Sequence, residues 1–141
     1  PELVRLLAEA LAMLGSERAV VFHSANGLDE LIPGVPATGI EVREGWTRPW
    51  KYDPAEVRQT TVDPAELAGG DAPSNAAMLT ALLEGEKGPR RETVLLNAAL
   101  GLVVADLART LDEGYERARS AVDDGRARDS FQRLRAAGAA P

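Results

Sequence analysis

The chain has 141 residues, a length typical of one domain, and its 45% hydrophobic and 27% charged residues are unlike those of disordered or collagen-like chains. Cysteine is absent, which excludes disulfides and a thiolate nucleophile and favours a reducing, cytoplasmic setting. The net charge of -6 disfavours nucleic acid or an anionic membrane as the main partner, because both would require a basic face.

The N-terminal residues predict a helix followed by a buried strand. In residues 1–14 leucine and alanine recur at spacings of three and four, the pattern of an amphipathic helix, and Gly15 suits its C-terminal cap. Residues 19–22 form an apolar run that is too short for a helix and suits a strand buried on both faces, as in a parallel sheet. The loop that follows lies at the carboxyl end of this strand, where α/β folds commonly bind ligands.

A β-hairpin and two short helical turns are predicted next. Residues 38–52 contain two alternating halves separated by Glu44 and Gly45, which is typical of a hairpin. Asp53 and Asp63 each precede a proline, so a capping carboxylate stands before a residue whose φ suits the first position of a helix.

Beyond residue 70 the pattern is helical almost to the end of the chain. We expect Asp71 to cap a helix that continues to about residue 83, and Gly88 with Pro89 to begin another. Residues 94–104 are apolar on nearly every side, so this second helix should be buried around most of its circumference.

Two further helices are predicted at the C-terminus. Thr110 and Glu113 have capping-box spacing and begin a helix that Gly125 ends, and a last arginine-rich helix covers residues 126–137. The chain supplies too few partners for one strongly buried strand and one nearly all-apolar helix. We therefore expect the covering half of the core to lie outside this sequence, which begins with Pro1 and reads as part of a larger protein.

The sharpest candidate site is the pair Asp29 and Glu30, in the loop after the buried strand. Adjacent carboxylates point apart on a helix or strand, but a loop lets both reach one small region. Mg²⁺ takes one or two protein carboxylates and fills its other positions with water and substrate phosphates. The alternative is a solvated acidic pair, because the nearby sequence offers no further ligands.

Three other polar features have structural interpretations. His23 is the only histidine, which disfavours a zinc site, and we interpret it as a strand-end residue that hydrogen-bonds locally. Gly69 and Gly70 resemble a phosphate cradle, but Asp71 would place its own anion at the helix N-terminus, so we interpret it as a cap. Asn97, a polar residue in an apolar stretch, either fixes packing between helices or faces a site.

Several segments together resemble anthranilate phosphoribosyltransferases in their order and spacing. They are V-V-F-H-S at 20–24, N-G-L-D-E-L at 26–31, G-G-D-A at 69–72 with N-A at 75–76, G-P-R-R at 88–91 and V-L-L-N-A-A at 94–99. The resemblance is to the C-terminal part of the family and runs along nearly the whole chain. It is weakest in residues 57–61, where the family usually carries a short hydrophobic, glycine-containing segment.

The resemblance implies a fold class and a domain assignment. The fold would be α/β, the C-terminal segment of a helix-flanked, mostly parallel sheet domain of the nucleoside phosphorylase/phosphoribosyltransferase type, with a β-hairpin and several C-terminal helices. Residues 1–141 would form this segment. The first part of the sheet and the N-terminal helical domain, through which the family usually forms homodimers, would be absent.

The resemblance also implies a reaction. The phosphoribosyl group would pass from phosphoribosyl pyrophosphate to the amine of anthranilate, with release of pyrophosphate, in tryptophan biosynthesis. Asp29 and Glu30 match the positions of the family's Mg²⁺-binding pair. The family's glycine-rich diphosphate loop lies upstream of this sequence, so the segment would be inactive alone.

Two other functions are possible alternatives to the anthranilate enzyme. One is a catalytically silent relative of the same fold that binds a ligand or partner. The other is a pyrimidine nucleoside phosphorylase-like enzyme, although G-L-D-E at 27–30 followed by G-G-D-A at 69–72 favours the anthranilate enzyme. A membrane location is disfavoured, because the longest uncharged stretch, residues 93–105, is shorter than the roughly 20 residues that span a bilayer.

Overall fold

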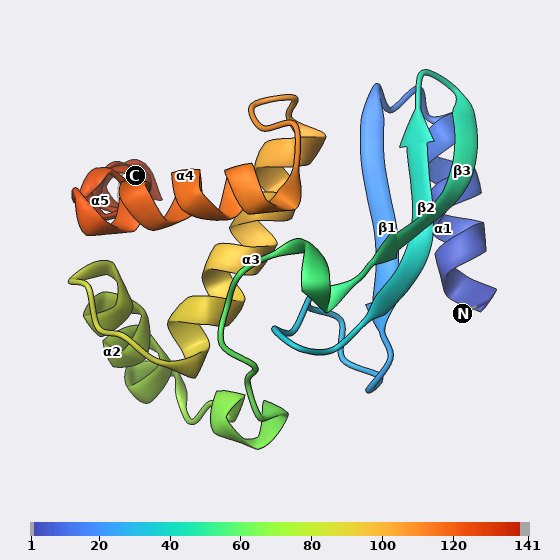
Figure 1. The fold of residues 1–141 in the computed structure, drawn as a ribbon. Helices are drawn as coiled ribbons and strands as arrows, with labels where there is room; N and C mark the ends of the chain where they lie inside the picture. The colour runs from blue at the N-terminus through green and yellow to red at the C-terminus, as the bar shows by residue number, and fades with distance from the viewer. Residues whose placement is uncertain (1, 139–141) are drawn as a thin grey trace.

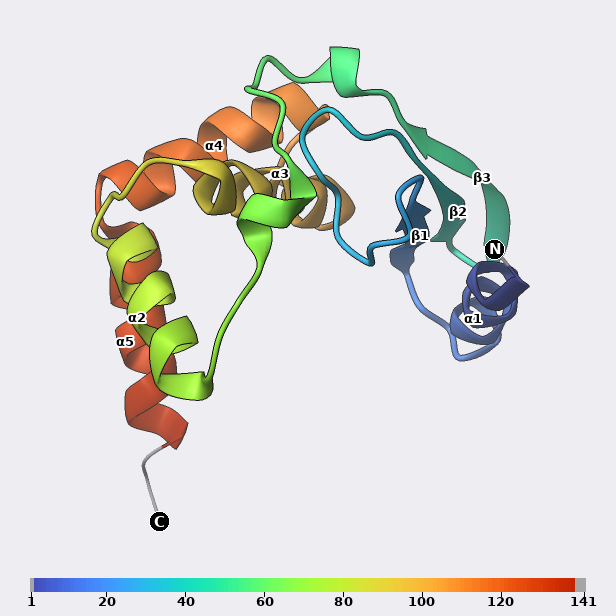
Figure 2. The ribbon, with the colours of Figure 1, turned by 90° about the horizontal axis from the view of Figure 1, so that it is seen from below.

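The computed structural model describes residues 2–138, and it consists of a small sheet with one helix on one side and four helices on the other (Figures 1 and 2). The elements in chain order are α1 Glu2–Met13, β1 Arg18–Ser24, β2 Ala37–Arg43, β3 Trp46–Tyr52, the 3-10 turns η1 Pro54–Glu56 and η2 Pro64–Leu67, α2 Ala72–Leu83, α3 Pro89–Val104, α4 Leu111–Asp123 and α5 Arg126–Gly138. The predicted α/β fold class is thereby confirmed. No helix within the described residues is long and apolar enough to cross a membrane.

The sheet has the order β1-β2-β3, and both pairs of strands are antiparallel. The turn between β2 and β3 consists of Glu44 at φ 48° and Gly45 at φ 83°. Positive φ at both central residues is the requirement of a type I′ turn, whose twist matches that of the two strands. The predicted hairpin is confirmed, with its turn at the predicted residues.

The burial predicted for β1 is wrong for this structure. Its residues are half-buried, apart from the buried Ser24 at its end, and within residues 2–138 it pairs with β2 alone. A strand is buried on both faces only when helices cover the sheet and strands pair with both of its edges. Here the outer edge of β1 has no neighbouring strand among the described residues.

Helix α1 is confirmed, but its leucine stripe does not face the sheet. Gly15, at φ 79°, follows the helix as predicted. Ala8 is buried against the strands, whereas Leu3, Leu6 and Leu7 are more than half exposed. The helix therefore has two apolar faces, of which the sheet covers only one.

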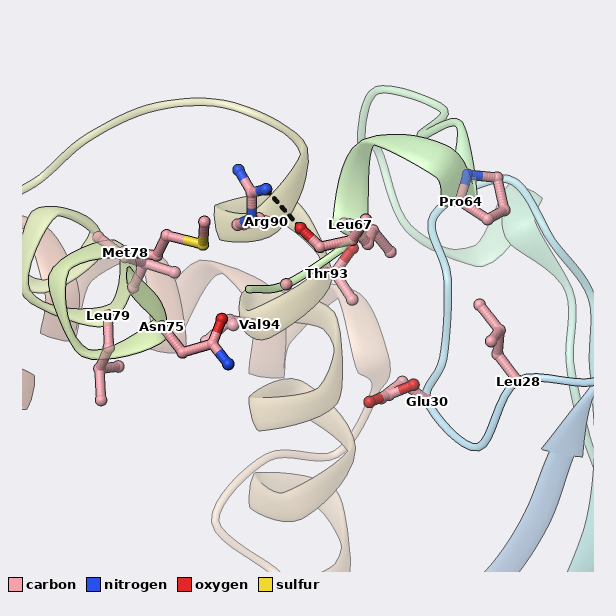
Figure 3. Close-up of a pocket in the computed structure, with 13 residues that line it drawn as sticks. Leu28, Glu30, Pro64, Leu67, Asn75, Met78, Leu79, Arg90, Thr93 and Val94 are labelled. Carbon is pink, nitrogen blue, oxygen red and sulfur yellow. Dashed lines mark hydrogen bonds between the residues drawn. The ribbon is translucent and has the colours of Figure 1, made fainter. Parts of the chain in front are cut away.

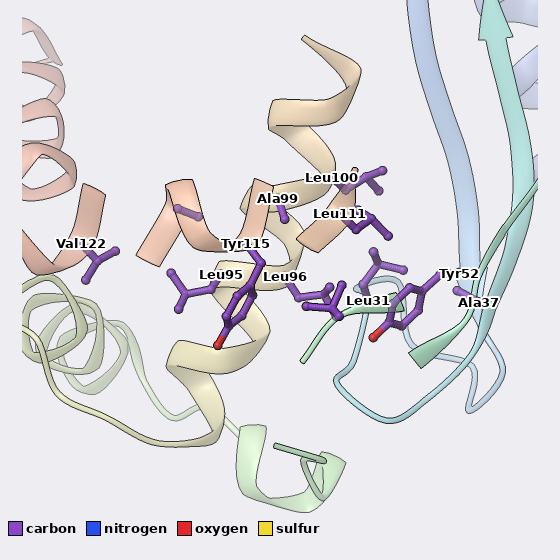
Figure 4. Packing of buried hydrophobic residues seen from close by; sticks show 12 residues of the cluster. Leu31, Ala37, Tyr52, Leu95, Leu96, Ala99, Leu100, Leu111, Tyr115 and Val122 are labelled. Carbon is purple, nitrogen blue, oxygen red and sulfur yellow. The ribbon is translucent and has the colours of Figure 1, made fainter. Parts of the chain in front are cut away.

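A continuous core fills the space between the hairpin and the crossing helices α3 and α4 (Figure 4). Its members come from the loop after β1, the hairpin, the segment after η1 and both helices: Leu31, Ala37, Tyr52, Val57, Leu95, Leu96, Ala99, Leu100, Leu111, Tyr115, Ala118 and Val122. The prediction that α3 is buried around most of its circumference is confirmed, and one narrow stripe of the helix is exposed. Val94 is 43% exposed, and Ala98 and Gly101 are exposed with it, because no described segment packs closely on this side.

Side-chain caps begin the helices where the sequence predicts. The Thr110 hydroxyl accepts a hydrogen bond from the Glu113 N–H at 3.1 Å, and the Glu113 carboxylate accepts one from the Arg109 N–H at 2.9 Å. Asp53 and Asp63 each accept a bond from the backbone N–H two residues later, at 3.0 Å, and so begin η1 and η2. Each cap satisfies a helix-terminal N–H that has no partner within its helix.

Residues 57–62, which include the stretch where the resemblance is weakest, are anchored by burial at both ends. Val57 and Val62 are buried, and the Val62 N–H donates to the Pro33 carbonyl at 3.0 Å. Between them the Gln59 side chain donates to the Tyr52 hydroxyl at 2.7 Å. Burial raises the pKa of Tyr52 to about 12.

A buried carboxylate links all three strands to the end of α3. Glu41 is 2% exposed and accepts hydrogen bonds from Arg18 Nε at 2.9 Å and Arg48 Nε at 2.6 Å. Arg18 also donates to the Val103 carbonyl at 2.5 Å and pairs with Asp106. Burial alone would raise the pKa of Glu41, but the hydrogen bonds and charges of Arg48 and Arg18 hold it below its ordinary value.

The Glu41 contacts predict a stability loss that depends on pH. Glu41→Gln should lower the free energy of unfolding by about 2 kcal/mol at neutral pH, because it removes charged hydrogen bonds from a buried site. The pKa is lower in the folded state, so this stabilisation is complete above the unfolded value of about 4.3 and disappears as pH falls through the folded value. Urea unfolding at pH 7 and below pH 4 measures both effects. Glu44→Gln in the exposed turn is the control, and equal losses in the two variants would contradict the prediction.

Helices α3 and α4 cross closely at a glycine. A Cβ atom at Gly114 would lie 2.7 Å from the carbonyl oxygen and 3.0 Å from the Cα atom of Ala99. Gly101 is also in a helix, but a Cβ atom there would meet nothing within 4 Å. The two glycines therefore differ in packing and share the same low helix propensity.

Alanine substitutions at the two glycines should change stability in opposite directions. Gly114→Ala should lower the free energy of unfolding by about 1 kcal/mol or more, because the clash is with backbone atoms that cannot rotate away. Gly101→Ala should raise it by up to about 1 kcal/mol, through helix propensity alone. Thermal and denaturant unfolding check the signs, and a stabilising Gly114→Ala would disprove the close crossing.

Candidate functional site

The predicted acidic pair lies in the loop that joins β1 to the core. Asp29 and Glu30 are both exposed, and the next residue, Leu31, is fully buried. Partial burial raises the pKa of the Glu30 carboxyl, and a hydrogen bond and charge repulsion from Asp29 raise it further. The structure therefore brings the two carboxyl groups into one small region, as a loop permits.

The loop is fastened to the rest of the fold at several backbone atoms. The Ser24 N–H donates to the Leu28 carbonyl at 3.1 Å, and the Ser24 hydroxyl donates to the Glu30 carbonyl. Asn97 of α3 bonds both backbone groups of Leu31. Asn97 therefore fixes packing, which is one of the two interpretations from the sequence. The packing that it fixes is between α3 and this loop, and not between two helices.

Among the described residues, the hydrogen-bond partners of His23 lie at the end of its own strand and on the neighbouring strand. Its Nδ1 lies 3.2 Å from the Ser24 carbonyl oxygen, and its Nε2 lies 3.4 Å from the Thr38 hydroxyl on the neighbouring strand. The interpretation as a strand-end residue is confirmed.

A cavity of about 440 Å³ extends from the acidic loop to α2 (Figure 3). Leu67, Met78 and Val94 are among the apolar side chains in its wall, and Glu30 and Arg90 are among the polar ones. In Figure 3 Glu30 points from its loop toward the space in front of α3. Arg90 is held in place by a bond from its Nη2 to the Ala68 carbonyl at 2.9 Å.

The glycine pair before α2 is confirmed as part of a cap. The Asp71 carboxylate accepts a hydrogen bond from the Ser74 N–H at 2.9 Å, and hydrogen bonds from the side chain and backbone of Ser74 hold the pKa of Asp71 below its ordinary value. Asn75 then pairs with both backbone groups of Gly70, at 2.8 and 3.0 Å. These bonds engage the N–H groups of Gly70 and Ser74 within the chain.

The donor set of the acidic loop fits a hard divalent cation. Neither Asp29 nor Glu30 takes part in an ion pair within residues 2–138, so the repulsion between them is not neutralised by a side chain. Residues 2–138 contain no group of three or more His, Cys, Asp or Glu side chains placed to hold a metal. Two carboxylates with open surroundings suit Mg²⁺, which keeps several waters, and do not suit a closed zinc site.

Sequence reasoning gave no role to Arg90 and Asn75. Both belong to motifs that carried the resemblance, G-P-R-R and N-A, but the cavity they line forms only where two loops and two helices meet. The spacing of residues in one segment contains no signal for such a cavity.

The chain is similar to known proteins in both sequence and fold. Residues 1–128 match the family described as glycosyl transferase family, a/b domain. The chain belongs to this glycosyl transferase family. Anthranilate phosphoribosyltransferase of Thermomicrobium roseum is 48% identical over 138 residues, which cover 96% of this chain and 40% of that protein. Anthranilate phosphoribosyltransferase 2 of Streptomyces coelicolor is 48% identical over 126 residues, covering 89% of this chain and 38% of that protein.

Solved structures are similar to this chain in fold. The crystal structure of anthranilate phosphoribosyltransferase from Thermus thermophilus matches 94% of this chain and 39% of that protein with a TM-score of 0.82 and 36% identity. The Saccharomyces cerevisiae enzyme with 4-fluoroanthranilate matches with a TM-score of 0.84 at 20% identity, which shows the fold alone. The resemblance to anthranilate phosphoribosyltransferases is therefore confirmed, and the chain spans about 40% of the length of the T. roseum relative.

The cap at Asp71 predicts a loss of stability without a loss of ligand binding. Asp71→Ala should lower the Tm by a few degrees, because one N–H of α2 loses its partner. The difference from wild type should shrink as pH falls below about 4, because a folded-state pKa below the unfolded value stabilises only the ionised form. Scanning calorimetry against pH and titration with inorganic phosphate provide the two measurements. An unchanged Tm with lost affinity would make Asp71 a ligand-binding residue.

Proposed function

We propose that the full protein carrying this chain transfers the phosphoribosyl group of phosphoribosyl pyrophosphate to anthranilate, as a step of tryptophan biosynthesis. The observation that supports this most strongly is the 48% identity to the T. roseum enzyme, which extends over 96% of the chain. The acidic loop and its cavity lie within this matched region.

The proposed reaction is a displacement at C1 of the ribose. The nitrogen of the anthranilate amine forms a bond to C1, the bond from C1 to the pyrophosphate oxygen breaks, and the amine loses a proton. An amine requires little activation as a nucleophile, so positioning and electrostatic stabilisation must supply most of the rate. The electron pair of the broken bond leaves with pyrophosphate, where negative charge develops.

Asp29 and Glu30 would hold Mg²⁺ at the end of β1. When bound, Mg²⁺ supplies positive charge to the leaving diphosphate and stabilises the transition state more than the ground state. The two carboxylates provide oxygen ligands that are unpaired with any described cation, and the cavity beside Glu30 leaves room for substrate.

The chain would be the C-terminal segment of the α/β domain in the full protein. The exposed leucines of α1, the open edge of β1 and the exposed side of α3 are apolar or unpaired surfaces that the remaining domain would cover. The segment alone would then be inactive. The family resemblance implies in addition a cytoplasmic location and a homodimer formed through an N-terminal helical domain.

Neutral variants of the acidic pair test the proposal. Asp29→Asn and Glu30→Gln, made in the full protein, keep the shape of each side chain and remove its charge. We expect normal folding and a loss of about 100-fold or more in kcat, the scale of losing one electrostatic contact to the developing charge. Excess Mg²⁺ should restore part of the activity by mass action.

A matched control and the alternative functions complete this test. Glu66→Gln removes an exposed carboxylate from η2, whose side chain does not line the cavity, and should leave turnover and its Mg²⁺ dependence unchanged. Wild-type behaviour of both loop variants would remove the metal assignment. If the full wild-type protein transfers no phosphoribosyl group, the silent relative is favoured, and phosphorolysis of pyrimidine nucleosides would favour the phosphorylase.

A further inference from the structure

The acidic loop holds its shape through contacts far from it in the sequence. Asn97 lies near the middle of α3, and its Oδ1 accepts a hydrogen bond from the Leu31 N–H at 3.0 Å. Its Nδ2 donates to the Leu31 carbonyl and to the Thr93 carbonyl, both at 2.8 Å. Both amide hydrogens and the amide oxygen are therefore engaged, and two of the three bonds reach the residue directly after Glu30.

The bonds of Asn97 and Ser24 meet on one peptide group. The carbonyl of Glu30 and the N–H of Leu31 belong to the same planar unit. The Ser24 hydroxyl donates to that carbonyl, and Asn97 Oδ1 accepts from that N–H. A peptide plane that is held on both sides fixes the backbone from which the Glu30 side chain projects.

Burial makes these bonds costly to lose. Leu31 is fully buried and Ser24 is 1% exposed, so water does not readily replace either partner. Asp29 and Glu30 themselves are exposed, and their own side chains bring no ion pair that would order them within the described residues. The order of the carboxylates must therefore come from the backbone beneath them.

We propose that Asn97 and Ser24 are positioning residues, which fix the peptide group between Glu30 and Leu31 so that the Asp29 and Glu30 carboxylates converge on a divalent cation. The inference rests on the proposed function, because it gives the two residues a role in the same metal site. Partners that orient metal ligands typically change metal affinity by 10- to 100-fold when removed. Asn97 is placed to act through the backbone and is not itself a ligand.

The test compares variants of the full protein by metal binding in the absence of substrates. Asn97→Leu keeps the branched shape of the side chain and removes all three of its hydrogen bonds. Ser24→Ala is a smaller change that removes the hydrogen bond from the Ser24 hydroxyl to the Glu30 carbonyl. The probe is Mn²⁺, followed by electron paramagnetic resonance, as a stand-in for Mg²⁺. We expect the Kd for Mn²⁺ to rise about tenfold in each variant and amide exchange to accelerate in peptides that span residues 28–35.

Tyr115→Phe is the matched structural control. Tyr115 is buried on α4 and donates to Glu92 of α3, so its loss also weakens packing around α3 but touches no atom of the loop. It should lower the Tm and leave Mn²⁺ affinity and loop exchange unchanged. In the complete reaction Asn97→Leu and Ser24→Ala should lower kcat, and Tyr115→Phe should not.

The outcomes separate this inference from the proposed function. If Asp29→Asn abolishes Mn²⁺ binding but Asn97→Leu and Ser24→Ala bind Mn²⁺ as the wild type does, the positioning role is overturned and the metal site stands. If Asp29→Asn and Glu30→Gln also leave Mn²⁺ affinity unchanged, the positioning role and the metal site are both overturned. A variant of Asn97 that does not fold leaves the decision to Ser24→Ala, whose unchanged Kd would equally overturn the inference.

Discussion

The guanidinium of Arg18 joins the sheet to the C-terminal end of α3, and the placement of the site depends on this junction. One edge of the group bonds the buried Glu41, and Nη1 bonds the Val103 carbonyl and Asp106. A cation suits this place, because the last carbonyls of a helix carry partial negative charge, and the Val103 carbonyl accepts from Arg18 in addition to the Asp106 N–H. The buried carboxylate offsets the cost of removing Arg18 from water, so the contact with α3 can persist within a mostly apolar interface.

Helix α3 is consequently attached to the first strand and its following loop at two separate points. Near the middle of the helix Asn97 bonds the backbone of Leu31, and at its end Val103 receives Arg18. The apolar contacts between the two points fill the space but have no direction, whereas hydrogen bonds fix distance and angle. The helix thus sets the position of the loop relative to the strand from which the loop emerges.

The features that could be predicted from the sequence are those whose chemistry is complete within a few residues. Asp71 with Ser74, and Thr110 with Glu113, satisfy helix-terminal N–H groups three residues away. The turn at Gly45 requires only a backbone that accepts positive φ. In each case the residues named by the pattern are the ones that make the contact.

Burial could not be predicted in the same way, because it depends on what lies opposite. The strand at residues 18–24 and the helix at residues 89–104 have the composition of fully covered elements, yet each has an open side in the described chain. Asn97 shows the same limit for a polar group, since its partner Leu31 stands 66 positions earlier. The acidic pair was predicted from its place after a strand and from the family resemblance, but the backbone bonds that hold it became visible only in the fold.

The contacts of Glu41 also constrain how this sequence can change over evolutionary time. Replacing Glu41 with an apolar residue would leave the largely buried charge of Arg18 without one of its acceptors and the Arg48 side chain without its carboxylate partner. A tolerated change therefore requires Arg18 and Glu41 to be exchanged together for residues of matching volume. Natural variation at Arg18, Glu41 and Arg48 should accordingly be correlated, and single differences at one of the three should be rare among functional relatives.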